Sequence, residues 1–149
     1  MIRRYGEVIK WGQKYRRRAG VYGVLLDGQS VLLTHQAAPV PEYQLPGGGI
    51  DAGENPIAAL HREVMEETGW HIGTVRHLGT YRRFTFMPEY DKWAEKVCYI
   101  FAARPTLRCG PPTEAGHRAV WASQAQALNL ITNQGDRAML QRALGQLPR

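Results

Sequence analysis

GGIDAGENPIAALHREVMEETGW, residues 48 to 70, is the stretch that decides the fold of this chain. Asn55 suits the N-cap of a helix, because its side-chain oxygen can accept a hydrogen bond from a backbone N–H that has no partner within the helix. Pro56 fits the first helical position, and Gly69 readily adopts the left-handed conformation that ends helices. The sequence therefore predicts a glycine-rich loop followed by a helix from Pro56 to Thr68.

Two faces of this predicted helix carry different side chains. At about 100° per residue, Ile57, Leu60 and Val64 form one apolar stripe, which we expect to pack on the core. The glutamates at positions 63, 66 and 67 have the i, i+3, i+4 spacing that places side chains on one face. Their like charges should destabilise an isolated helix by some tenths of a kcal/mol per pair. A bound cation would relieve this repulsion, and oxygen ligands suit Mg²⁺ or Mn²⁺; a solvated acidic face is the alternative.

The spacing of the whole stretch resembles the signature of the Nudix hydrolases, G-x5-E-x7-R-E-U-x-E-E-x-G-U, in which U is a bulky apolar residue. The matching residues are Gly48, Glu54, Arg62, Glu63, Val64, Glu66, Glu67 and Gly69. Trp70 is bulky and apolar but departs from the usual aliphatic residue. Leu45-Pro46-Gly47, just before the stretch, is also typical of the family.

This resemblance implies both a fold and a reaction. The fold would be α/β, a Nudix-type α/β/α sandwich with a mixed β-sheet between helices. The reaction would be MutT-like, with Mg²⁺ or Mn²⁺ as cofactor: water attacks phosphorus and cleaves a phosphoanhydride bond. The expected partner is a small-molecule pyrophosphate, a nucleoside diphosphate linked to another group.

The resemblance also assigns roles to residues of this box. The groups that it implies for metal binding and catalysis are the side chains of Glu63, Glu66 and Glu67, with a backbone carbonyl near Gly47 or Gly48 as a further metal ligand. Glu54 and Arg62 are similar to the pair that braces the loop against the helix. The catalytic base is open in this family, so Glu114 is our first choice, with Glu89 and Glu95 as alternatives.

Candidates for substrate binding lie outside the box. Arg82 and Arg83 could contact phosphates, although one of two adjacent strand residues must face away. Tyr43 and Tyr90 could stack on a base, as could Phe84 and Trp93; core packing is the alternative for each.

The remaining sequence indicates one α/β domain at 19–149, preceded by a basic segment, 1–18, that is part of it or appended to it. The expected β-hairpin spans 19–26 and 30–35, and strands are expected at 44–46, 75–87, 96–103 and 118–122. A turn is expected at 27–29 within the hairpin, and loops are expected at 37–43 and 88–95. Helices are expected at 123–130, where Ser123 can serve as the N-cap, and at 135–147.

The basic segment holds seven of the 19 Lys and Arg residues and contributes to the net charge of +6. It could attract nucleic acid, but it shows no recognisable binding module, so we do not expect nucleic acid as a partner. No apolar run is long enough to cross a membrane, and we see no secretory core. Two cysteines, Cys98 and Cys109, are too few for a disulfide framework. We therefore expect a cytoplasmic protein, and a homodimer stays open.

The sequence is also compatible with three functions other than hydrolysis of a nucleoside diphosphate linked to another group. The Pro46-Gly-Gly-Gly-Ile50 run, with Arg16, Arg17 and Arg18 before the first strand, is similar to the diphosphoinositol-polyphosphate branch of the superfamily. A (deoxy)nucleoside triphosphate is another candidate substrate. A non-catalytic Nudix-like module that binds nucleotides would be expected to lack one or more box glutamates, and this chain has them all.

Overall fold

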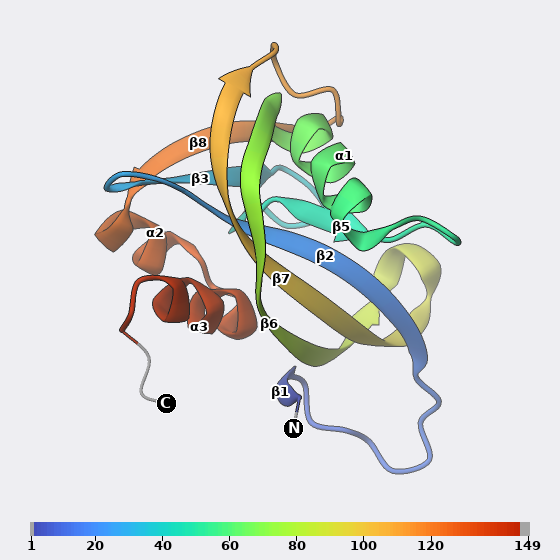
Figure 1. Cartoon of the computed structure of the whole chain (residues 1–149). Coiled ribbons are helices and arrows are strands. Elements are labelled where there is room, and N and C mark those ends of the chain that lie inside the picture. The colour runs from blue at the N-terminus through green and yellow to red at the C-terminus, as the bar shows by residue number, and fades with distance from the viewer. Residues whose placement is uncertain (1, 147–149) are drawn as a thin grey trace.

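A mixed sheet of eight strands separates one helix from two others (Figure 1). The computed structural model describes residues 2–146, without the side chain of Glu89. The strands are β1 (Arg3–Gly6), β2 (Arg16–Asp27), β3 (Ser30–Gln36), β4 (Glu42–Gln44), β5 (Gly47–Gly49), β6 (Trp70–Met87), β7 (Lys92–Arg108) and β8 (His117–Ser123). The helices are α1 (Pro56–Thr68), α2 (Gln124–Leu130) and α3 (Gln134–Ala143), with one 3₁₀ turn, η1 (Pro88–Tyr90).

The strand order is β1-β6-β7-β2-β3-β4, while β5 pairs with β2 and β8 pairs with β3. The β1/β6 and β2/β7 pairs are parallel, and the other pairs are antiparallel. With α1 on one face and α2 and α3 on the other (Figure 1), the predicted α/β/α sandwich is confirmed.

Helix α1 has the predicted bounds and caps. The Asn55 side chain accepts from the backbone N–H of Ile57 at 2.9 Å and of Ala58 at 3.3 Å, and Gly69 takes a left-handed φ of 77°. Leu60 and Val64 are fully buried against the sheet. The expected burial of Ile57 is wrong, because its residue is 42% exposed. Ile57 lies in the first turn, and the burial of α1 begins only two residues later.

Helices α2 and α3 cover the opposite face of the sheet. Ser123 caps α2 as predicted, since its hydroxyl accepts from the N–H of Gln126 at 3.1 Å. Helix α3 begins one residue before the predicted start and ends at Ala143, whereas Leu147, the predicted end, lies outside the described residues. The core beneath these helices includes Val24, Tyr81 and Leu140.

The predicted loop at 88–95 is too long, because only residues 88–91 connect the two strands. Strands β6 and β7 stay paired to Met87 and Lys92 and are joined by η1, so Glu95 lies within a strand. Contacts between the Phe86 and Trp93 rings, whose centroids are 5.2 Å apart, help to hold this end of the hairpin.

The short strand before the glycines is also displaced from 44–46 to 42–44. Strand β4 pairs with β3, which places Tyr43 opposite His35 within the sheet. Pro46 cannot extend this pairing, because it has no N–H to donate.

The basic N-terminal segment contacts the rest of the sheet. Strand β1 runs parallel to β6, and the Tyr5 ring meets the Tyr81 ring edge-on at 5.3 Å. Arg16, Arg17 and Arg18 begin strand β2. Over residues 2–146, no helix combines the length and the apolar character that a membrane span requires.

Candidate active site

The glycine loop and α1 meet at two carboxylates. The backbone N–H of Gly47 donates to Glu67 Oε1 at 3.0 Å, and the side chain of Glu67 is only 8% exposed. The carboxylate of Glu63 lies against Gly48 so closely that a Cβ added there would be 2.6 Å from Glu63 Oε2. Gly48 is therefore required for the approach of the loop to the helix.

Burial makes these two carboxyl groups weaker acids than usual. It raises the pKa of Glu67 to about 8, to which the charges of Glu63, Glu114 and Glu66 add, while the hydrogen bond from Gly47 opposes the shift. Burial also raises the pKa of Glu63, against the opposing effect of Arg62. A bound cation would favour the ionised form of each carboxyl group and so oppose this rise in pKa. The electrostatics of the cluster therefore suit a cation.

Arg62 joins the loop to the acidic face. Its guanidinium makes a two-pronged contact with Glu54, from Nε to Oε2 at 2.8 Å and from Nη2 to Oε1 at 2.9 Å. Nη2 also donates to the carbonyl of Gly49 at 3.1 Å. The hydrogen bonds from Arg62 lower the pKa of Glu54 to about 2. The structure thus brings together the two residues expected to brace the loop.

The same guanidinium lies between two of the expected metal ligands. Nη1 donates to Glu63 Oε1 at 2.9 Å and to Glu66 Oε1 at 3.3 Å. In this arrangement, no three His, Cys, Asp or Glu side chains of the described residues are positioned to hold a metal together. The donor chemistry nevertheless fits Mg²⁺ or Mn²⁺, because the acidic face of α1 offers carboxylate oxygens.

The loop after β7 places Glu114 beside the cluster. The N–H groups of Thr113 and Glu114 donate to the carbonyl of Glu66 at 2.9 and 2.8 Å. These bonds supply partners for a carbonyl in the last turn of α1, where carbonyls have none within the helix. A Cβ on Gly69 would overlap the carbonyl oxygen of Gly110, so only glycine permits this packing. Glu114 is exposed, and its charge helps to raise the pKa of Glu67.

The alternative bases are placed differently. Glu95 Oε1 forms an ion pair with Arg17 Nη2 at 3.0 Å. The side chain of Glu89 lies outside the described residues.

His117 is a neighbour of the cluster that the sequence did not reveal. Its Nε2 lies 3.7 Å from Glu67 Oε2, and its Nδ1 lies 2.9 Å from the hydroxyl of Thr34. Burial lowers the pKa of His117. No spacing in the sequence links these residues, because the pairing of β8 with β3 brings them together.

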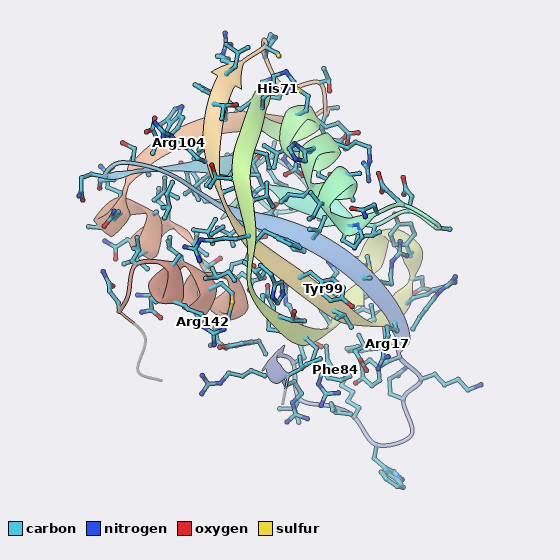
Figure 2. All side chains as sticks on the ribbon, viewed as in Figure 1. Arg17, His71, Phe84, Tyr99, Arg104 and Arg142 are labelled. Carbon is cyan, nitrogen blue, oxygen red and sulfur yellow. The ribbon has the colours of Figure 1, made fainter. Side chains whose placement is uncertain are left out.

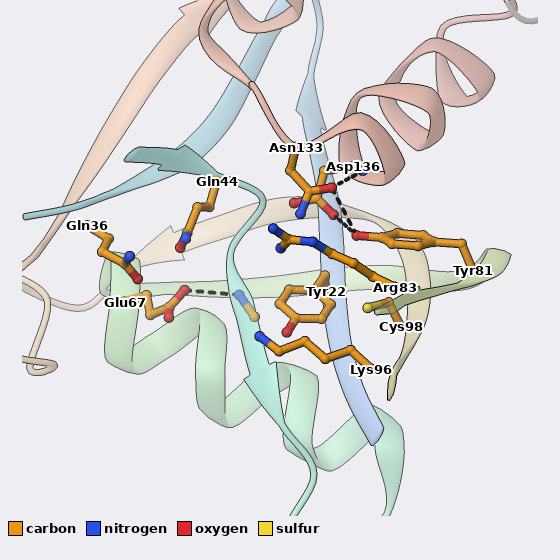
Figure 3. Close-up of a pocket in the computed structure, with 11 residues that line it drawn as sticks. Tyr22, Gln36, Gln44, Glu67, Tyr81, Arg83, Lys96, Cys98, Asn133 and Asp136 are labelled. Atoms are coloured by element: carbon orange, nitrogen blue, oxygen red, sulfur yellow. Dashed lines mark hydrogen bonds between the residues drawn. The ribbon is translucent and has the colours of Figure 1, made fainter. Parts of the chain in front are cut away.

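A polar cavity of about 160 Å³ opens beside Glu67 (Figure 3). Its lining includes Tyr22, Gln36, Gln44, Gly47, Glu67, Tyr81, Arg83, Lys96, Cys98, Asn133 and Asp136. Tyr81 donates its hydroxyl to Asp136 Oδ1 at 2.5 Å, and Asp136 is almost fully buried. Burial raises the pKa of Asp136 to about 6. No pattern in the sequence indicated that Tyr22, Lys96, Asn133 and Asp136 would lie at this cavity.

The four residues expected to bind substrate are separated by the fold. Arg83 lines the cavity beside Glu67, and Tyr90 lines a neighbouring one. Arg82 lies instead with Glu95 and Tyr99 in a different hollow, as expected for adjacent strand residues. Tyr43 packs edge-on against His35, with ring centroids 4.7 Å apart, and is not among the residues that line the cavity beside Glu67.

Most of the chain matches the model of a known protein family. The family model of the NUDIX domain matches residues 14–143. That match covers most of the chain, so the chain belongs to the Nudix family.

Solved structures of this class have the same fold. A Nudix hydrolase from Nitrosomonas europaea superposes with a TM-score of 0.71 at 18% identity, covering 87% of this chain and 90% of that chain. A MutT protein from Bacillus halodurans superposes with a TM-score of 0.70 at 22% identity, covering 85% and 82%.

Curated relatives match over shorter stretches. The chain is 34% identical over 70 residues to the "Putative 8-oxo-dGTP diphosphatase" of Bacillus subtilis, with 47% of each chain covered. It is 43% identical over 62 residues to Nudix hydrolase 26, chloroplastic, of Arabidopsis thaliana, covering 41% of this chain and 28% of the relative. It is 44% identical over 57 residues to an RNA pyrophosphohydrolase of Cereibacter sphaeroides, covering 37% and 34%. The chain therefore aligns with less than half the length of these relatives.

Proposed function

We propose that this protein is a Mg²⁺- or Mn²⁺-dependent hydrolase that cleaves a phosphoanhydride bond of a nucleoside diphosphate linked to another group. The observation that carries the proposal is the buried carboxylate of Glu67, which accepts from the glycine loop and lies among like charges beside a polar cavity. A complete set of box glutamates favours this enzyme over a non-catalytic nucleotide-binding module. The names of two curated relatives, a diphosphatase and a pyrophosphohydrolase, agree with the reaction class.

Each group in the site has a distinct part in this proposal. Glu63, Glu66 and Glu67 would hold the metal, with a carbonyl near Gly48. When bound, the metal neutralises phosphate oxygens and lowers the pKa of water.

Residues around the metal ligands complete the proposed mechanism. Glu114 accepts the proton of the attacking water. Arg83, which lines the cavity beside Glu67, binds phosphate oxygens through charge-assisted hydrogen bonds. Glu54 holds Arg62, which in turn orients Glu63 and Glu66.

The test is a screen with Mg²⁺ and Mn²⁺ over nucleotide sugars, dinucleoside polyphosphates, (deoxy)nucleoside triphosphates and diphosphoinositols. We expect metal-dependent hydrolysis of at least one class. In ¹⁸O-water the label should appear in a phosphate product, because the water attacks phosphorus. Hydrolysis of diphosphoinositols alone would keep the reaction class but contradict the nucleoside diphosphate as substrate. Absence of hydrolysis across all four classes would contradict the proposal as a whole, and an unlabelled phosphate product would contradict the mechanism.

A further inference from the structure

Three cationic side chains lie side by side across three adjacent strands. Arg83 of β6 is directly opposite Lys96 of β7, and Lys96 is directly opposite Arg18 of β2. Side chains of directly opposed residues share one face of a sheet. The row therefore begins at the cavity beside Glu67 and leads away from it across the sheet.

Two further cavities continue in the same direction. A cavity of about 330 Å³ shares Tyr22, Gln36 and Lys96 with the first, and it is also lined by Arg18, Gly48 and Tyr90. A third, of about 560 Å³, shares Arg18 and Tyr90 with the second and adds Arg16 and Lys92. Since neighbouring cavities share lining residues, they adjoin one another beside the glycine loop, and we call the three cavities together the trough.

The far end of this trough is positively charged. Among the described side chains, no carboxylate forms an ion pair with Arg16, Arg18 or Lys92, although Arg17 pairs with Glu95 at 3.0 Å. Asp51 also lines this end, but its carboxylate lies 3.6 Å from Arg62 Nη2. The far end therefore offers cations without matching anions from the described part of the chain.

The side chain of Arg18 is positioned by an aromatic ring. Its guanidinium lies over the ring of Tyr90, with its central carbon 4.8 Å from the ring centroid. A guanidinium stacked in this way keeps the N–H donors at its edge available to an anion. Such a donor fork matches the oxygens of a phosphate group.

We infer that Arg16, Arg18 and Lys92 form a second, phosphate-binding subsite, and that the preferred substrate carries phosphate on the group beyond its scissile pyrophosphate. This inference rests on the proposed function, because the first cavity must hold the reacting end of the same molecule. The phosphate-bearing group is a second nucleotide or a phosphorylated polyol, and both chemistries suit the same three cations.

The experiment compares substrates with and without the additional phosphate. ADP-glucose has an unphosphorylated far group, diadenosine tetraphosphate has a second nucleotide, and a diphosphoinositol polyphosphate has a phosphorylated polyol. We expect the wild-type protein to hydrolyse one of the last two with a higher kcat/KM than ADP-glucose. The preferred one of the two identifies the source of the phosphate.

The variant that tests the subsite is Arg16→Gln/Lys92→Gln. For the preferred phosphorylated substrate, its KM should rise about tenfold, because charged hydrogen bonds are lost. KM for ADP-glucose should change less than about twofold. A matched control, Arg104→Gln/Arg108→Gln, removes two exposed cations near the other end of β7 and should leave both values unchanged; Figure 2 shows Arg104 far from Arg17.

The outcomes separate the two proposals. If no substrate is hydrolysed, the proposed function fails. If the diphosphoinositol polyphosphate alone is hydrolysed, the nucleoside part of the proposed function is wrong while the subsite stands. If kcat/KM for ADP-glucose equals or exceeds that for the phosphorylated substrates, the subsite is refuted while the proposed function stands. The same holds if the double variant raises KM equally for all substrates.

Discussion

The acidic face of α1 and the basic trough across β6, β7 and β2 are assembled in different ways. The acidic residues come from one continuous stretch and are positioned by contacts within it, such as those of Arg62 with Glu54 and Glu63. The basic residues come from distant parts of the chain and meet only through strand pairing. We infer that the local motif supplies the chemistry and the sheet selects the substrate, so changes in the two regions should have separable effects.

Metal removal is expected to have the largest effect and to act on the acidic face alone. Chelation with EDTA should abolish hydrolysis, whereas the melting temperature should shift by no more than about 5 °C. The fold should persist because α1 packs on the sheet through the buried side chains of Leu60 and Val64, and this packing needs no metal. Calorimetry with and without EDTA measures the shift, and excess Mg²⁺ should restore activity. Global unfolding on chelation would contradict the claim that the metal is needed for hydrolysis but not for folding.

Replacement of the proposed base tests the chemistry on the acidic side. Glu114→Gln should lower kcat about a hundredfold with little change in KM, because a general base typically contributes at least that factor. Steady-state kinetics provide the measurement, with Glu7→Gln, another exposed glutamate, as the matched control. If kcat stays near the wild-type value, the base lies elsewhere.

Two adjacent arginines test the basic side. Arg83→Gln should raise KM about tenfold, since Arg83 lines the cavity beside Glu67 and a charged hydrogen bond would be lost. Arg82→Gln removes the same charge from a different hollow and should change KM less than about twofold. Equal effects of the two variants would show that net charge, rather than placement, controls binding.

Asp136 of α3, which lines the cavity beside Glu67 together with Arg83 and Lys96, is expected to change the stability of the protein with pH. The pKa of Asp136 in the folded protein, about 6, lies above its ordinary value of 3.8, so ionisation of this buried group opposes folding. Its contribution to the free energy of unfolding should decline as pH rises from about 4 to 6 and remain lost above that range. The loss should be about 3 kcal/mol.

Urea unfolding of the wild-type protein and Asp136→Asn between pH 4 and 6 measures this difference. The variant should lack the part of the decline that Asp136 causes, while Asp27→Asn, at an exposed position, should retain it. Parallel pH profiles for the wild type and Asp136→Asn would contradict a raised pKa of Asp136.

The sequence predicted the elements whose signals are local. Asn55, Pro56 and Gly69 define α1 without reference to any other part of the chain, and Ser123 does the same for the start of α2. The turn at 27–29 likewise predicted the β2–β3 hairpin.

Features that depend on long-range pairing could not be predicted in this way. His117 reaches Glu67 because β8 pairs with β3, and no spacing indicates that contact. The continued pairing of β6 with β7 likewise turned the expected loop around Glu95 into a strand.

The most direct test of the account is the hydrolysis rate of Glu67→Gln as a function of Mg²⁺ concentration. The amide oxygen of the new side chain could still accept from the N–H of Gly47, so the loop and the fold should persist, as circular dichroism can verify. We predict that kcat falls by about two to three orders of magnitude at every Mg²⁺ concentration, because a charged group essential to metal binding is lost. Near wild-type, Mg²⁺-dependent hydrolysis by this variant would contradict the assignment of the acidic face as the metal-binding centre.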